Sequence, residues 1–401
     1  MAIKVLVATP VYYPEVGGGA LATYLITDLL ARSDQLRLTV LTGAKNPKRV
    51  NGVNYIYDPL MKLINKHYFP PTMLAKRYQR ILKEHDVIYV VYAFPFIPLG
   101  KAHGKKVIVH LHDYRPISLN GVVLAGTRAS SSVSLLINSF TIKLIQKSRI
   151  VDLAKNVLNI PYTLQVRRWV CMADTIIAVS KRHAEILSKY MPECKGKIKV
   201  LYNPLPKFPK FEKRLENVPT FLYCGGDNYM KGFHILIKAL KIIGEKKHTC
   251  IKFVLTGKYS QKSLNIINQL KKRYNLNVKA LGIVEYNDLV KLHSKAWALL
   301  FPSIWEEPLP YVVLEACLLE TTPIASKVGG VPEILRDTPA EEFLFEPYEL
   351  NNILEKIELF MSVANKKYLS SLSSELREKI INRFNNDIVK DSLLNIILNV
   401  V

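Results

Sequence analysis

The 401-residue sequence lacks the long apolar run that a membrane-spanning helix needs. Such a helix takes about 20 apolar residues, whereas the most apolar stretches, 87–100 and 296–305, are short and interrupted by proline. The N-terminal MAIKVLVATPV runs directly into a turn-rich stretch, which does not fit a signal peptide. We therefore expect a cytoplasmic protein whose contact with a membrane is peripheral.

Cysteine is scarce, and the common nucleotide-binding fingerprints are missing. The five cysteines show no C-x-x-C pair and no histidine at metal-ligand spacing, so we expect reduced core thiols and no metal site. Neither G-x-G-x-x-G nor G-x-x-x-x-G-K-[ST] occurs. Their absence argues against a dinucleotide-dependent oxidoreductase.

Acidic residues are few, since 33 Asp and Glu stand against 56 Lys and Arg, a net charge of +23. This balance predicts attraction to nucleic acid, an anionic membrane or phosphorylated substrates. Basic residues concentrate in 62–83 and 128–169, where aromatic and apolar residues are interleaved, which suggests docking on an anionic membrane, although a solvated basic face is the simpler alternative. No stacking platform or recognition helix favours nucleic acid, so we expect no nucleic-acid partner and keep a polyanion-binding protein only as an alternative.

What the sequence does contain is the same pattern twice. Residues 4–8 form an apolar run of strand length, followed by a glycine-rich loop and a helical stripe, and residues 219–243 repeat this order. Apolar strands alternating with helices predict parallel sheets covered on both faces. We expect two tandem Rossmann-like α/β domains, 1–200 and 201–375, facing across a cleft, with a C-terminal helix, 376–401, packing back on the first domain. Ligands should bind at the carboxyl ends of the strands.

Three loops at strand ends carry groups suited to a phosphorylated ligand. Gly18 and Gly19 lead into a helix, where N–H groups favour an anion, although an ordinary tight turn explains these glycines equally well. Lys231 stands where a lysine can meet a diphosphate, or it is a solvated surface lysine. His112 ends a strand and is placed to hydrogen-bond a ligand or move a proton, or it is a structural histidine. His110 shares its side, but no carboxylates complete a metal site.

The stretch EEPLPYVVLEA, residues 306–316, holds two carboxylates on either side of an apolar run. If a helix begins near Pro310, Glu307 precedes it and Glu315 lies inside it, roughly 8–12 Å away at about 1.5 Å per residue. That distance is about the one between the sugar and the ribose of a nucleotide sugar. Carboxylates are suited to accept hydrogen bonds from the hydroxyls of both groups. The alternative is that both are solvated acids at the edge of a core helix, and Glu306 has no assigned role.

Together these segments resemble a known family, the retaining glycosyltransferases of family 4, or glycosyl transferases group 1, with the two-domain GT-B fold. Residues 302–335 are similar to the family's E-x7-E segment and its G-G-x-P-E loop. Further segments match in the family's order along most of the chain: PVYYPEVGGG, HLHD, ADTIIAVSKRHAEIL, KVLYNPL and KGFHILIKAL.

The resemblance implies specific roles for the residues that match its motifs. Glu315 would accept hydrogen bonds from the ribose, Glu307 would hold the donor sugar, and His112 would contact that sugar near the reacting centre. Lys231 would neutralise the diphosphate. The backbone of the glycine loop and the helix entry would cradle it, at Gly18, Gly19, Pro310, Tyr311 and Val312.

The implied enzyme is a retaining, metal-independent hexosyltransferase without a cofactor. Its donor would be a UDP- or GDP-linked sugar and its acceptor a glycan or lipid-linked hydroxyl, used in glycan or glycolipid assembly at the cytoplasmic membrane face. A nucleotide-sugar epimerase on the same fold is the alternative within this architecture. One departure stands out: Gly226 occupies the position where the family usually has a phosphate-binding arginine, and Lys258 is a candidate replacement.

Overall fold

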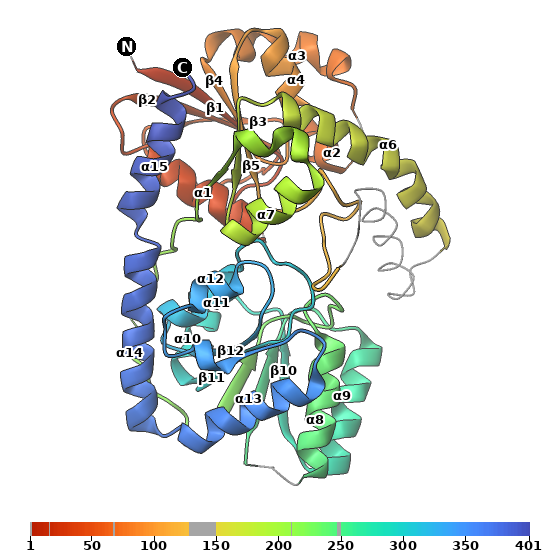
Figure 1. The fold of residues 1–401 in the computed structure, drawn as a ribbon, viewed down its shortest axis with the longest axis vertical. Coiled ribbons are helices and arrows are strands. Elements are labelled where there is room, and N and C mark those ends of the chain that lie inside the picture. Colours follow the sequence, from red (N-terminus) through yellow and green to blue (C-terminus); the bar gives the residue numbers. More distant parts are fainter. Residues whose placement is uncertain (1, 16, 67–68, 128–149, 210, 247–249) are drawn as a thin grey trace. The chain divides into compact units, whose positions relative to one another are not determined.

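The computed structural model describes residues 2–15, 17–66, 69–127, 150–209, 211–246 and 250–401, and it divides into two compact units (Figure 1). Unit 1 is Met1–Leu205 together with Phe384–Val401, and unit 2 is Pro206–Arg383. The sequence had placed these boundaries near 200 and 375. Most of the second basic stretch, 128–149, lies outside the described residues.

Unit 1 is built on a seven-stranded parallel sheet with the order β3-β2-β1-β4-β5-β6-β7. Its inner strands are almost wholly buried, because their near-continuous apolar sequences leave no polar face for solvent. The strands are β1 (Ile3–Thr9), β2 (Leu36–Thr42), β3 (Asn54–Tyr57), β4 (Val87–Val90), β5 (Lys106–Leu111), β6 (Thr175–Ala178) and β7 (Ile198–Val200). The helices are α1 (Gly18–Leu30), α2 (Leu60–Lys66), α3 (Pro71–Glu84), α4 (Phe96–Ala102), α6 (Ile150–Met172), α7 (Lys181–Tyr190), η1 (Pro192–Lys197) and α15 (Asn386–Leu398).

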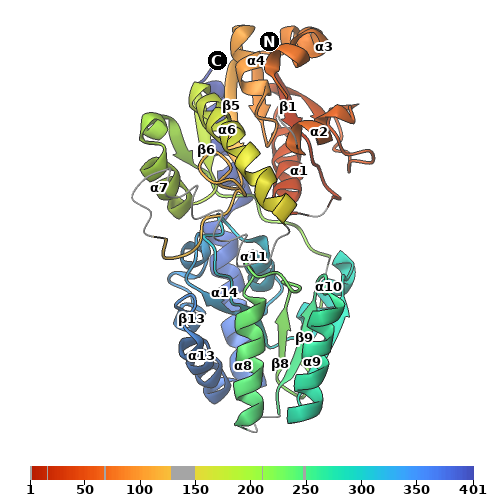
Figure 2. The ribbon, with the colours of Figure 1, turned by 90° about the vertical axis from the view of Figure 1, so that its right-hand side faces the viewer.

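Unit 2 repeats the architecture on a six-stranded parallel sheet with the order β10-β9-β8-β11-β12-β13. Helices α8 and α9 run side by side along this sheet (Figure 2). The strands are β8 (Thr220–Tyr223), β9 (Lys252–Thr256), β10 (Asn277–Gly282), β11 (Ala298–Phe301), β12 (Thr322–Ser326) and β13 (Leu344–Phe345). The helices are α8 (Phe233–Glu245), α9 (Gln261–Tyr274), α10 (Tyr286–Lys295), α11 (Tyr311–Leu318), α12 (Val331–Leu335), η2 (Glu341–Phe343), α13 (Leu350–Val363) and α14 (Lys366–Arg383).

The prediction of doubly wound α/β sheets is confirmed, as is the return of the C-terminal helix to the first unit. Helix α15 packs against α1, and its Leu393 and Ile397 are buried in the same core as Ile26 and Leu30 of α1. No helix in the described part of the chain has the length and hydropathy to cross a bilayer.

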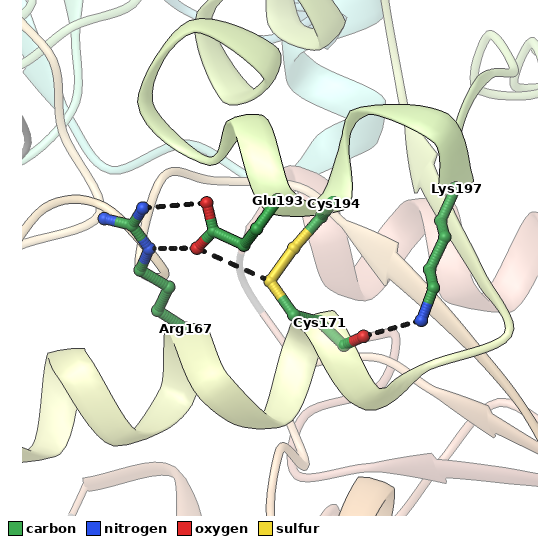
Figure 3. Close-up of a disulfide and its surroundings, with 5 residues drawn as sticks. All are labelled: Arg167, Cys171, Glu193, Cys194 and Lys197. Atoms are coloured by element: carbon green, nitrogen blue, oxygen red, sulfur yellow. Dashed lines mark hydrogen bonds and ion pairs between the residues drawn. A yellow bond between two sulfur atoms is a disulfide. The ribbon is translucent and has the colours of Figure 1, made fainter.

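The prediction of five reduced core thiols is wrong. Cys171, at the end of α6, forms a disulfide with Cys194 of η1 (Figure 3). The two helices bring the Cα atoms to 5.4 Å, within bridging range. An ion pair between Arg167 and Glu193, 2.7 Å from Nε to Oε1, joins the same two elements. Of the remaining cysteines, Cys317 is buried, Cys224 is partly buried and Cys250 is exposed.

Thiol titration tests the disulfide directly. Denatured protein purified without reductant should show three reactive thiols with Ellman's reagent and five after reduction. The Cys171→Ser/Cys194→Ser variant should lose about 3 kcal/mol of unfolding free energy in urea, because the bridge closes a loop of 23 residues. Cys250→Ser, which removes an exposed thiol, is the control and should not change the free energy. Five thiols before reduction would contradict the assignment.

Candidate functional site

A buried ion pair lies at the carboxyl end of the unit 2 sheet. Lys231 Nζ is 2.8 Å from both carboxylate oxygens of Glu307, and Ser303 Oγ donates to Glu307 Oε1 at 2.7 Å. Glu307 is only 4% exposed, so the paired cation and the hydroxyl offset the cost of burying its charge. The ammonium group also lies 5.8 Å and 5.7 Å from the ring centres of Phe301 and Trp305.

The backbone of Glu307 is held by the G-G-V-P-E loop before α12. Gly330 N–H donates to the Glu307 carbonyl oxygen at 2.9 Å. A Cβ atom on Gly329, whose φ is +49°, would lie 1.8 Å from the same oxygen, so only glycine fits. The Gly329 N–H donates to Glu306 Oε2 at 2.8 Å, and Glu306 is buried. This contact gives the previously unassigned Glu306 a place in the site, as an anchor for the loop.

Helix α11 begins directly after this ion pair. Pro310 precedes it and has no N–H, so the first helical amides are those of Tyr311 and Val312, and no side chain caps them. The amides and the helix dipole favour an anion at this end. Lys231 and the start of α11 therefore border the same loop region after β11.

Glu315, one turn inside α11, has a different environment from Glu307. It is 7% exposed, and within the described part of the chain its carboxylate accepts a hydrogen bond from Tyr286 Oη at Oε1, 3.4 Å away. Burial raises the pKa of Glu315 to about 7, while the Tyr286 hydrogen bond opposes this shift. Tyr286 is the first residue of α10, and its ring stacks on that of Phe208 at 5.7 Å.

The structure explains the missing arginine at Gly226. This residue has a φ of +58°, and a Cβ atom there would lie 2.6 Å from the carbonyl oxygen of Lys258 and 2.9 Å from its nitrogen. No side chain fits at this position without moving the β9–α9 loop. The Lys258 side chain is exposed beside this turn.

In unit 1, the glycine loop ends at α1 without a side-chain cap on the helix. A Cβ atom on Gly19 would lie 2.2 Å from the Tyr92 hydroxyl oxygen. The glycine is therefore required to make room for the Tyr92 ring, a reason that the sequence did not reveal. Gly18 lies one residue earlier, as the first residue of the helix.

His112 follows β5 and belongs to a stack of aromatic rings. Its ring centre is 4.3 Å from that of His110 and 6.0 Å from that of Tyr92. Tyr89 Oη and His110 Nδ1 are 2.7 Å apart, which fixes the His110 ring. Burial lowers the pKa of His112 to about 3, so the imidazole is neutral at neutral pH and acts through hydrogen bonds.

The structure therefore groups the predicted residues into one set in each unit. Lys231, Glu307 and the entry of α11 surround one loop in unit 2, with Glu315 further along the helix. Gly19 and His112 are linked through Tyr92 in unit 1. The sequence reasoning missed Ser303, Tyr286 and Tyr92. Ser303 and Tyr92 each lie two residues after the end of a strand, and Tyr286 begins a helix, and these positions are weak sequence signals.

Two family models match consecutive parts of the chain. The model described as Glycosyltransferase Family 4 matches residues 16–206, and the model described as Glycosyl transferases group 1 matches residues 206–383. The two models together span nearly the whole chain and meet at the boundary between the two units.

Curated relatives carry names of the same kind. The chain is 27% identical over 175 residues to an uncharacterized glycosyltransferase of Methanocaldococcus jannaschii, a match that spans 40% of this chain and 44% of that protein. It is 24% identical over 307 residues to the capsular polysaccharide biosynthesis glycosyltransferase CapM of Staphylococcus aureus, covering 72% and 78% of the two chains. A third match, 29% identical over 142 residues, covers 33% of this chain and 35% of the UDP-Gal:alpha-D-GlcNAc-diphosphoundecaprenol alpha-1,3-galactosyltransferase of Escherichia coli.

Solved structures share the fold. HepE of Anabaena, in complex with UDP and glucose, superposes with a TM-score of 0.65 at 17% identity, over 99% of this chain and 100% of that one. Sucrose-phosphate synthase of Thermosynechococcus elongatus gives 0.69 at 17% identity, over 100% and 99%. The fold, the motifs and the two matching models agree, and the chain belongs to the GT-B glycosyltransferases of family 4 and group 1.

Proposed function

We propose that this protein is a retaining glycosyltransferase that moves a hexose-type sugar from a nucleoside-diphosphate sugar to a hydroxyl of a glycan or lipid-linked acceptor. The observation that carries the proposal is the Lys231–Glu307 ion pair beside the start of α11, with Glu315 further along the same helix. This arrangement places a cation and a helix N-terminus together with two buried carboxylates. A nucleotide sugar has the complementary groups: a diphosphate between two sugars that carry hydroxyls.

The proposed roles follow from the chemistry of each group. Glu315 accepts hydrogen bonds from the ribose hydroxyls, and Glu307 accepts from the donor sugar. Lys231, now held by Glu307, moves its interaction to the diphosphate when the donor binds, and with the amides at Tyr311 and Val312 it stabilises the departing charge. A metal ion is not needed for this stabilisation in the proposed mechanism. The neutral His112 donates or accepts a hydrogen bond at the donor sugar.

Retention is proposed to result from attack on the same face as the departing diphosphate, because no side chain of the candidate site stands out as a nucleophile. The name of the Escherichia coli relative, a UDP-Gal-dependent galactosyltransferase acting on a diphosphoundecaprenol-linked sugar, supports a UDP-sugar donor and a lipid-diphosphate acceptor, and the UDP and glucose held by HepE support the same donor class. The alternative of a nucleotide-sugar epimerase is not favoured, because the matching models and named relatives are glycosyltransferases.

We further propose that the protein works at the cytoplasmic face of a membrane. The basic stretch 62–83 includes α3, whose interleaved apolar and aromatic residues Leu74, Tyr78 and Leu82 are buried in unit 1 and do not face outward. The opposite side of α3 exposes Lys76 and Lys83, and Met73 is 73% exposed. Exposed cations around an exposed methionine are suited to anionic headgroups.

Donor turnover tests the proposed reaction. Thermal-shift screening with UDP-, GDP- and ADP-sugars should identify a stabilising donor, and nucleoside diphosphate should then be released mainly when an acceptor is present. Lys231→Met should lower kcat by about 100-fold or more, because the departing diphosphate loses its cation. Since this variant also leaves Glu307 buried and unpaired, the Lys231→Met/Glu307→Gln variant should recover stability but not activity.

Lys272→Met, which removes an exposed lysine at the end of α9, is the matched control and should keep the wild-type kcat. C2-epimerised sugar without transfer would contradict the proposed reaction. Wild-type kcat in Lys231→Met would contradict the assigned site.

The pKa of Glu315 predicts how donor affinity depends on pH. Only the ionised carboxylate accepts from both ribose hydroxyls, so affinity for the UDP- or GDP-sugar should fall as the pH decreases through about 7. Tyr286→Phe removes a hydrogen bond that favours the ionised form, and should move the midpoint of this fall to higher pH. Calorimetric titration between pH 6 and 8.5 measures it. The other titratable neighbours, Tyr311 and Cys224, have pKa values raised by burial and stay neutral in this range.

Glu315→Gln is the control, and its affinity should be weak and independent of pH. Because the folded protein keeps a proton on Glu315 up to about pH 7, whereas the ordinary value is 4.5, ionised Glu315 lowers stability above that window. Glu315→Gln should therefore be more stable than the wild type at pH 8. A wild-type affinity that stays constant from pH 6 to 8.5 would refute the role of Glu315.

Liposome flotation tests the membrane proposal. The protein should float with vesicles containing anionic phosphatidylglycerol and not with neutral vesicles, and added salt should release it. Lys76→Glu/Lys83→Glu should weaken flotation at least several-fold, whereas Lys195→Glu/Lys199→Glu, an equal charge change at exposed positions of unit 1, should not. Equal flotation of both variants would locate the membrane contact elsewhere, and no flotation at low salt would reject it.

A further inference from the structure

Tyr92 has a backbone conformation that its side chain does not favour. It follows β4 with a φ of +61°, in the left-handed region where glycine or asparagine is usual. A bulky residue persists in this region only when the surrounding structure holds it there, and such positions cluster at ligand-binding sites. The contacts of the Tyr92 side chain must therefore hold the backbone in this conformation.

The side chain lies between two residues of the proposed donor site. On one side, its hydroxyl is against the first turn of α1, where a Cβ on Gly19 would come within 2.2 Å of the oxygen. On the other side, its ring centre is 6.0 Å from that of His112. The Arg115 guanidinium lies over the ring, 4.4 Å from its centre, and is itself paired with Asp113, 2.8 Å from Nε to Oδ2.

This group contains polar atoms that the described residues leave without a hydrogen bond. His112 Nε2 has no partner among them, nor has Nε2 of His110, which is 1% exposed and stacks on His112. Tyr92 is partly buried, and its hydroxyl makes no hydrogen bond to the described residues. Burial raises the pKa of Tyr92 above its usual value, so the hydroxyl keeps its proton and remains a donor.

We propose that Tyr92 is a donor-binding residue, whose hydroxyl donates a hydrogen bond to a diphosphate oxygen of the nucleotide sugar at the start of α1. This inference rests on the proposed function. The uncapped amides of α1 and the Arg115 cation favour an anionic oxygen over a neutral sugar hydroxyl at this place. Gly19 then has two tasks, since its missing side chain admits both the phenol ring and the ligand that the phenol contacts.

Tyr92→Phe is the direct test, because it removes the hydroxyl and keeps the ring and its contact with Arg115. The KM for the UDP- or GDP-sugar should rise about tenfold, with kcat within about twofold of the wild type, because the hydroxyl contacts a diphosphate oxygen that is already charged in the ground state, whereas Lys231 neutralises the charge that develops as the sugar leaves. The melting temperature should not change. Tyr274→Phe is the matched control, because Tyr274 ends α9 and its hydroxyl donates to the exposed Glu245 at the end of α8, so the KM of this variant should equal that of the wild type.

Gly19→Ala tests the same contact from the helix side. The added methyl group must displace the Tyr92 ring, since it would also lie 2.8 Å from two ring carbons, so the KM should rise again. If both changes act through one hydroxyl, Gly19→Ala/Tyr92→Phe should raise the KM less than the product of the single effects.

The outcomes separate this inference from the function on which it rests. An inactive wild type that binds no nucleotide sugar removes the proposed function and the inference with it. An active wild type with an unchanged KM in Tyr92→Phe overturns the inference alone. A lower KM in Tyr92→Phe also overturns it, because the phenol would then obstruct the diphosphate.

Discussion

Parallel pairing is the constraint on which the candidate site depends. Every paired strand of the described chain runs parallel to its neighbour, so the carboxyl ends of the strands in each unit meet at one edge of the sheet. In unit 2, this edge gathers the loops after β8, β11 and β12. These loops supply Lys231, Glu307 and Gly329 from positions far apart in the sequence. Each of these loops begins on a buried strand, which fixes where it starts at this edge.

Within this edge, two carboxylates on one short segment have different electrostatic environments. Glu307 is compensated by an ammonium group and a serine hydroxyl, whereas Glu315 has a tyrosine hydroxyl at a longer distance and a pKa raised to about 7. Burial alone does not distinguish them, since both are less than a tenth exposed. The difference lies in their partners. Glu307 has a cation that can move to a ligand, whereas Glu315 has a proton that it can lose near pH 7. Two carboxylates whose environments give them different charge states are typical of sites in which each acid has its own role.

The sequence predicted the strands, helices and loops better than the contacts that explain why a particular residue occupies its position. Strands and glycine loops carry local signals, and the spacing of Glu307 and Glu315 is a local property. Helix α11 is buried almost all round, so its apolar periodicity could not say which way Glu315 points. In α3, the apolar residues that suggested a membrane face belong to the core, because a basic amphipathic helix gives the same pattern for either role. The disulfide and the Tyr92–Gly19 contact join residues without any shared local motif, and only the folded chain brings them together.

The first turn of α1 also depends on the last helix of the chain, a relation that no local sequence pattern indicates. Residues after Arg383 return to unit 1, where Val389, Leu393 and Ile397 of α15 are buried with the apolar face of α1. Helix α1 carries Gly18 and Gly19 at its first turn, and that turn faces the Tyr92 ring. The position of the proposed diphosphate contact in unit 1 therefore relies on the last helix of the chain as well as on β1. Unit 2 is thereby joined to unit 1 by two covalent connections, after Leu205 and after Arg383, so that the terminal helix supports a site built from the first residues of the protein.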